Sequence, residues 1–138
     1  MVKLNHIQHI GIPVLHLQNS ILFYQKLGFK NSMYATYNYK EGKGNVAMMQ
    51  VGAIIIKLYQ LPPNELYTIQ NRRDGHIDHI AFDVEDIDEA FNTLKSNHFN
   101  VVENEPKYLN FWQKGCKYFN IIGPDGERLQ FNQILKYE

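Results

Sequence analysis

The sequence has one cysteine, no net charge and no long apolar run, and each shortage excludes a class of protein. A single cysteine, Cys116, rules out an internal disulfide and a multi-cysteine metal site. Fourteen basic residues balance fourteen acidic ones, so no overall field favours nucleic acid or an anionic membrane surface. The chain has no apolar run long enough for a membrane span and no apolar signal core at its start. We therefore expect a cytoplasmic protein that binds a small molecule, with no nucleic acid and no membrane partner.

The remaining composition is that of one ordinary globular domain. A chain of 138 residues with 44% hydrophobic content can fill one core, so we expect a single domain over residues 1–138. Nine tyrosines and eight phenylalanines favour strands and aromatic cavity walls. Cys116 lies in an apparent strand with no histidine nearby, and we interpret it as a packing residue.

The chain contains an internal repeat, which sets the expected architecture. At an offset of 70 residues, identical or apolar residues match one another: His9 with His79, Ile10 with Ile80, Val14 with Val84, Ile21 with Phe91 and Phe29 with Phe99. Towards the end of each copy the offset becomes 73, where Ile56 meets Leu129 and Lys57 meets Gln130. The repeat predicts two modules, over about 5–60 and about 76–134, with a linker at 61–75.

Each copy opens with a short strand whose two faces differ. Ile10 and Ile12 share one face, while His9 and Gly11 share the other, and His79 takes the same place in the second copy. Because both helices should cover the apolar faces, we expect His9 and His79 to face away from the helices.

A helix and three further strands complete each predicted module. The first helix spans about 19–27 and ends at Gly28, and the second spans about 87–96 and begins with a capping-box pattern at Asp86 and Glu89. The strands are expected at about 31–38, 45–51 and 53–60, then at about 100–105, 116–122 and 127–134. The fold class is therefore α+β, with two tandem βαβββ modules.

Four local strings resemble the vicinal oxygen chelate superfamily, which includes glyoxalase I, bleomycin-resistance proteins and extradiol dioxygenases. They run from His9 to Val14, from Ser20 to Tyr24, from Lys26 to Phe29, and from Gly123 to Phe131. The resemblance covers about residues 6–134 and includes the duplication. It implies paired half-barrels around a central cavity, with a metal at the centre of the cavity in metal-dependent members.

The metal ligands of such members, carried over by position, fall on His9, Lys57, His79 and Gln130. Histidine is an expected ligand, but the other two places usually hold glutamate. A lysine ammonium has no lone pair to donate, and glutamine offers only a neutral carbonyl oxygen. We therefore expect zinc, nickel, manganese or iron to bind weakly or not at all. The alternative is a triad of His9, His79 and Gln130, with Lys57 deprotonated or swung away.

Lys57 and several aromatic residues are the candidate ligand-binding and catalytic positions. Lys57 alternates with the helix-facing Ile56 and Leu58, so it should point where His9 points. Lys57 is either a cation inside the cavity or a solvated lysine on an edge strand, where lysine opposes aggregation. If it is in the cavity, its candidate acidic partners are Glu65, Asp83 and Glu127. The aromatic candidates, which could equally be ordinary strand packing, are Tyr37, Tyr59, Phe111, Trp112 and Tyr118.

Three functions are consistent with this pattern. The first is a metal-free protein of the bleomycin-resistance kind that binds an anionic or aromatic compound. The second is a metal-dependent lyase or dioxygenase, similar to lactoylglutathione lyase, with His9 and His79 as ligands. The third is a metal-free enzyme in which Lys57 supplies the electrostatic effect of a metal. Many members of the family form dimers, so a homodimer is the expected assembly.

Overall fold

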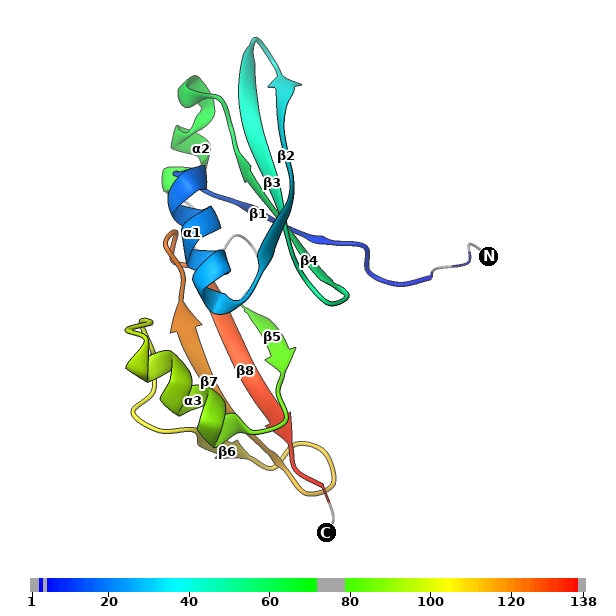
Figure 1. Ribbon diagram of the computed structural model, residues 1–138, viewed down its shortest axis with the longest axis vertical. Helices are drawn as coiled ribbons and strands as arrows, with labels where there is room; N and C mark the ends of the chain where they lie inside the picture. The colour runs from blue at the N-terminus through cyan, green and yellow to red at the C-terminus, as the bar shows by residue number, and fades with distance from the viewer. Residues whose placement is uncertain (1–2, 4, 72–78, 137–138) are drawn as a thin grey trace. The chain divides into compact units, whose positions relative to one another are not determined.

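The computed structural model describes residues 3, 5–71 and 79–136, and the chain divides into two compact units. The first unit is Met1–Gly75 and the second is His76–Glu138. Each unit holds a four-stranded mixed sheet and one long helix (Figure 1). The architecture is α+β, as predicted from the repeat. Within the described residues, no helix has the length and apolar character needed to cross a membrane.

The first unit follows the order strand, helix and three strands. Its elements are β1 Ile10–Pro13, α1 Leu17–Leu27, β2 Lys30–Tyr39, β3 Gly42–Val51 and β4 Ile54–Gln60. The sheet order is β1-β4-β3-β2, with β1 parallel to β4 and the other pairs antiparallel. The segment predicted as a linker at 61–75 contains two short helices, η1 at Pro63–Glu65 and α2 at Tyr67–Gln70. Its last residues, 72–75, lie outside the described part of the chain.

The second unit repeats this topology. Its elements are β5 Ile80–Asp83, α3 Ile87–Ser96, β6 Lys107–Leu109, β7 Cys116–Ile122 and β8 Arg128–Ile134. The sheet order is β5-β8-β7-β6, again with one parallel pair, β5 and β8. The first residues of the predicted second module, 76–78, are not among those described. The two copies read from the sequence therefore have the same fold.

The strand expected at 100–105 is wrong. Val101 forms only an isolated bridge with Ile121, and the edge strand β6 begins at Lys107. Two features prevent a longer ladder. The Glu103 carboxylate accepts the backbone N–H of Asn120 at 2.6 Å, and Pro106 has no N–H to donate.

Each helix covers one face of its sheet. The opposite face is the one that the helix does not cover. In the first unit Ile56 and Leu58 are fully buried on the helix side, where α1 contributes Tyr24. In the second unit the Phe91 ring of α3 meets Phe119 edge-on, and Phe119 stacks on Phe131. Residues that alternate with these point away from the helix. We call that side of each sheet its distal face.

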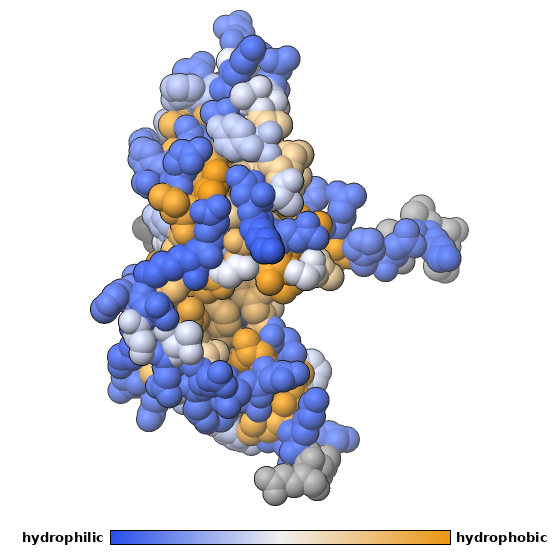
Figure 2. Space-filling view, viewed as in Figure 1, coloured by the Kyte–Doolittle hydropathy of each residue, from blue (hydrophilic) through white to orange (hydrophobic). Residues whose placement is uncertain are grey.

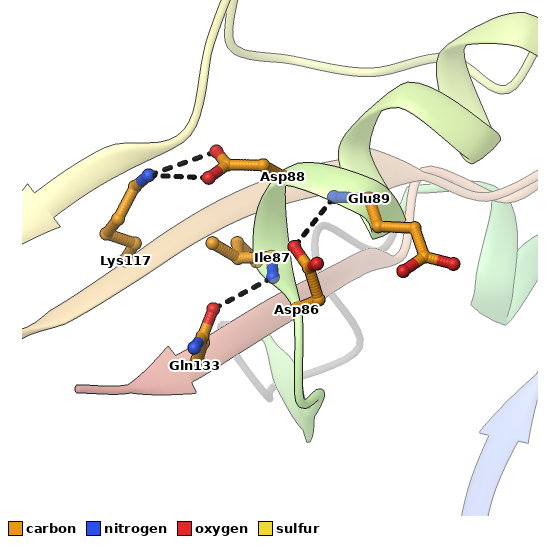
Figure 3. A network of polar contacts seen from close by, with 6 residues as sticks. All are labelled: Asp86, Ile87, Asp88, Glu89, Lys117 and Gln133. Atoms are coloured by element: carbon orange, nitrogen blue, oxygen red, sulfur yellow. Dashed lines mark hydrogen bonds and ion pairs between the residues drawn. The ribbon is translucent and has the colours of Figure 1, made fainter. Parts of the chain in front are cut away.

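A glutamine from the last strand caps the helix in both units. The Gln60 side-chain oxygen accepts the N–H of Leu17 at 2.7 Å, and the Gln133 oxygen accepts the N–H of Ile87 at 2.9 Å (Figure 3). The N-cap bond of the predicted capping box also forms, because the Asp86 carboxylate accepts the N–H of Glu89 at 3.0 Å. These bonds satisfy N–H groups that an isolated helix leaves unpaired.

The two helices also end in the same way. Gly28 stops α1 in the left-handed conformation, with φ of 118°, as the sequence predicts. His98 takes the equivalent place in the second unit with φ of 65°. The following residues complete the match, because Phe29 donates to the Tyr24 carbonyl and Phe99 to the Leu94 carbonyl. The predicted end of α1 is correct, and its start lies two residues earlier, at the Gln60 cap.

The capping glutamines give the first prediction. His16 at the start of α1 offers no capping side chain, and the first turn has no acidic residue, so α1 depends on Gln60. We expect Gln60→Ala to lower the free energy of unfolding by about 1 kcal/mol in urea titration. Gln133→Ala is the matched control and should lose less, because Asp86 still caps α3. Equal losses for the two variants would contradict the assignment.

Candidate functional site

Lys57 lies on the distal face of the first sheet, where the sequence places it. Its neighbours across the ladder are Gly11 on β1 and Met48 on β3. The side chain is half-buried, and its ammonium nitrogen lies 5.7 Å from the centre of the Tyr59 ring. A cation at this distance from an aromatic face is attracted to it. Lys57 and Tyr59 therefore form one cationic and aromatic unit on this face.

Tyr37 crosses the same face from the edge strand β2. Its hydroxyl donates to the backbone oxygen of Gln60 at 3.3 Å, and its ring lies where a side chain at Gly44 would be. Glycine at that position is therefore required by the close approach of the ring. Burial raises the pKa of the Tyr37 hydroxyl above its ordinary value, and the hydroxyls of Tyr59 and Tyr39 raise it further.

His9 stands just before β1 and shares the face of Gly11 by alternation. It is half-buried, and its Nδ1 lies 3.0 Å from the side-chain oxygen of Gln8. A proton on Nδ1, donated to this oxygen, leaves the lone pair on Nε2. In that tautomer Nε2 can accept a hydrogen bond or bind a metal.

Glu65, one of the three carboxylates considered for Lys57, has a different partner. Its carboxylate lies 3.6 Å from the ammonium of Lys40, and the side chain is nearly buried. Within the described residues no ion pair joins Lys57 to a carboxylate of the first unit.

Gln130 holds the position in the second unit that corresponds to Lys57. Its neighbours across the ladder are Ala81 on β5 and Asn120 on β7. The Gln130 side-chain oxygen accepts a hydrogen bond from the Asn132 amide at 3.1 Å. The Gln130 position thus holds a neutral amide, in contrast to the Lys57 cation of the first unit.

Asn120 and Glu103 belong to this face and were missed in the sequence. Asn120 is buried and donates its backbone N–H and its side-chain amide to the two Glu103 oxygens, at 2.6 and 2.9 Å. The signal was a polar residue within the apolar run Phe119 to Ile122. The pairing with Glu103 depends on a contact 17 residues away in the chain, which periodicity does not show.

His79 and Tyr118 also lie on the distal side of the second sheet. His79 is exposed and precedes Ile80, so alternation places it with Ala81. Tyr118 is half-buried between Asn132 and Lys107 across the ladder. Each unit thus carries one histidine and at least one tyrosine beside the Lys57 or Gln130 position.

Phe111 and Trp112 lie elsewhere. They occupy the loop between β6 and β7 and are 58% and 67% exposed. Figure 2 shows hydrophobic residues at the surface among hydrophilic ones. Phe111 and Trp112 are among the large exposed hydrophobic side chains of the described residues. Cys116, in contrast, is fully buried and free, as a packing residue should be.

The donor set at the four carried-over positions does not suit a divalent metal. Lys57 supplies a positive charge, and the Gln130 oxygen already accepts a bond from Asn132. Two like unit charges about 4 Å apart repel by roughly 4 kcal/mol at an effective dielectric of 20. In the part of the chain that is described, no three histidine, cysteine, aspartate or glutamate side chains form a cluster that could hold a metal.

The fold places the chain among proteins built from paired βαβββ modules, and the comparison with family models identifies the family. A model described as Glyoxalase/Bleomycin resistance protein/Dioxygenase superfamily matches residues 6–131. The chain belongs to this superfamily. A relative is the uncharacterised protein YwbC of Bacillus subtilis, 27% identical over 128 residues, which cover 92% of this chain and 96% of YwbC.

Solved structures with the same fold carry several different activities. A glyoxalase family protein from Bacillus cereus has a TM-score of 0.73 and 22% identity, covering 98% of this chain and 97% of its own. The trypanothione-dependent glyoxalase I of Leishmania major has a TM-score of 0.66 and 20% identity, with 92% and 85% covered. FosX, the fosfomycin resistance protein of Listeria monocytogenes, has a TM-score of 0.67 and 12% identity, with 96% of both chains covered. These likenesses show the fold.

The raised pKa of Tyr37 gives the second prediction. The unfolded chain releases this proton near pH 10.0, whereas the folded protein retains it to higher pH. The stabilising contribution of Tyr37 is therefore fully present below pH 10.0 and is lost as pH rises through the raised pKa. We expect Tyr37→Phe to be less stable than wild type near neutral pH, because it lacks the bond to Gln60, with a smaller difference above pH 10.0.

Urea unfolding of both proteins across this pH range measures the effect. Tyr67→Phe is the matched control, because it removes a tyrosine hydroxyl from a residue of the same unit that is 62% exposed. A difference in the free energy of unfolding between wild type and Tyr37→Phe that stays constant with pH would contradict the raised pKa of Tyr37.

Proposed function

We propose that this protein binds a small anionic aromatic compound, with the Lys57 ammonium contacting the anionic group. The observation that supports the proposal is a half-buried cation on the distal face of the first sheet, at a position where metal-dependent relatives commonly carry a carboxylate. The charge faces the side of the sheet that the helix leaves uncovered. An anion there would form charge-assisted hydrogen bonds with Lys57.

The surroundings of Lys57 favour an aromatic body on the ligand. Tyr59 lies beside the ammonium, and Tyr37 lies on the same face over Gly44. Gly11 has no side chain, and a Cβ there would already be in contact with the Tyr59 ring at 3.6 Å. The Tyr59 ring itself therefore lies close to the backbone of β1, and a planar ligand would stack against the tyrosines.

The relatives support a small-molecule function without naming the compound. One solved relative is a fosfomycin resistance protein and another is a trypanothione-dependent glyoxalase I. For this chain we propose binding without a tightly held metal, because Lys57 and Gln130 replace the usual carboxylates. A metal-free reaction is the second candidate, since the Lys57 ammonium would stabilise an enolate-like charge that develops on the ligand.

The third prediction tests the charge of Lys57. We expect Lys57→Met to weaken the binding of aryl carboxylates roughly ten- to a hundredfold, because a charge-assisted hydrogen bond contributes about 1.5–3 kcal/mol. The corresponding neutral aryl amides should bind wild type and variant alike. Isothermal titration of a panel of benzoates and naphthoates, each with its amide, measures both affinities.

Lys43→Met is the matched control, because Lys43 is an exposed lysine of the same sheet, on β3. It removes one positive charge without touching the distal cluster of Lys57 and Tyr59. Equal losses in Lys57→Met and Lys43→Met would show only a long-range charge effect and would contradict the proposal. A loss that affects the amides as strongly as the acids would also contradict it.

The fourth prediction concerns the metal. We expect the wild-type protein to bind zinc, nickel, manganese or iron weakly or not at all, and the Lys57→Glu, Gln130→Glu double variant to bind much more tightly. Two carboxylates would replace one cation and one neutral amide, and borderline divalent ions favour such a set with histidine. Elemental analysis of protein purified without chelator, followed by metal titration, decides the question. Stoichiometric metal in the wild type would contradict the electrostatic reasoning.

We also propose that the protein is a homodimer, as its family membership suggests. Sedimentation velocity at several concentrations measures the mass directly. A single species with the 16.2 kDa mass of the chain at every concentration would show a monomer.

A further inference from the structure

An open cavity lies at the surface of the second unit, at the C-terminal end of β8. Its volume is about 470 Å³, within the range of cavities that take small molecules. Ile134 follows Gln130 by four residues on β8, which corresponds to about 13 Å along a strand. Neither Gln130 nor Tyr118 contributes to its wall. The described residues that line it are Trp112, Gln113, Ile134, Leu135 and Lys136.

The backbone at Trp112 is strained. Its φ of 66° is in the left-handed region, which a residue with a bulky side chain adopts at a cost in free energy. Such a conformation persists only where neighbouring contacts hold it, and it is frequent at ligand sites.

Contacts on both sides of the loop between β6 and β7 hold it in place. The Tyr108 ring lies against Gly115, where a side chain would collide with it, and the Tyr108 hydroxyl donates to the Lys114 carbonyl at 3.4 Å. The Leu135 N–H donates to the Gly115 carbonyl at 2.9 Å. The loop is thus tied to the end of β8. Trp112 remains 67% exposed at the wall of the cavity, although large apolar side chains are usually buried.

The chemistry of the wall selects one kind of ligand. Its apolar part is an indole ring with Ile134 and Leu135, and its charged part is the Lys136 ammonium. None of the described lining residues is acidic. An indole face and a cation at the rim complement an aromatic ring system that carries one negative charge.

We propose that this cavity is a second ligand site, which binds a polycyclic aromatic anion between Trp112 and Ile134 with its charge at Lys136. The site shares no residue with the one proposed at Lys57. It explains why a strained, exposed tryptophan is held in place on the surface.

The single tryptophan makes the site directly observable, because Trp112 is the only one in the chain. The probe is anilinonaphthalene sulfonate, an aromatic anion that accepts excitation energy from a nearby indole. We expect saturable quenching of Trp112 emission together with sensitised probe emission. Trp112→Ala should weaken probe binding roughly tenfold. Because this variant has no indole to excite, its affinity is measured by exciting the probe directly. Lys136→Met should weaken it roughly two- to fivefold, because the charge is at an exposed rim.

Matched controls separate this site from that of Lys57. The uncharged analogue N-phenyl-1-naphthylamine should bind Lys136→Met as it binds wild type. Lys57→Met should leave the quenching of Trp112 unchanged while weakening the aryl carboxylates, so that either site can fail without the other.

Three results would overturn the proposal. The first is probe binding without any quenching of Trp112. The second is an equal loss of probe affinity in Lys57→Met and Lys136→Met, which would show only a long-range charge effect. The third is a change in sedimentation in Trp112→Ala without a change in probe affinity, which would make the loop a contact between copies of the chain.

Discussion

The structure depends on one constraint, which is that each sheet has one face buried beneath its helix. Ile56 and Leu58 are fully buried under α1, and Phe119 and Leu129 have the same exposure in the second unit. Successive residues of a strand point to opposite faces, so burying Ile56 and Leu58 directs Lys57 to the other side. A shift of register by one residue would place a lysine in the core, at a cost that no partner there could offset. The candidate site therefore follows from the packing of the core.

The duplication makes the two units alike in backbone and different in chemistry. Both helices begin at a glutamine of the last strand and end at a left-handed residue, so the scaffold is repeated in detail. On the distal faces the equivalent positions hold Lys57 in one unit and Gln130 in the other. Neither position of this chain holds a carboxylate, because Lys57 is a cation and Gln130 is a neutral amide.

Much of the fold could be predicted from the sequence, because it follows from patterns that each extend over only a few residues. Alternation in the first strands, the capping box at Asp86 and the glycine at 28 each act over a few residues, and the structure confirms them. The repeat then extends these local signals to a whole module. The expected strand at 100–105 failed because a side chain from the loop, Glu103, takes a backbone donor of β7. The spacing of apolar residues gives no information about a side chain that competes for a backbone hydrogen bond.

The sequence by itself determined which residues share a face, including His9 with Lys57 and Ala81 with Gln130. Only the tertiary structure decided what these residues touch. It paired Glu65 with Lys40, placed Tyr37 over Gly44, and joined Asn120 to Glu103. The physical reason is the range of the interactions. The direction of a side chain follows from its own strand, whereas its partners come from segments many residues away, brought together when the core is buried.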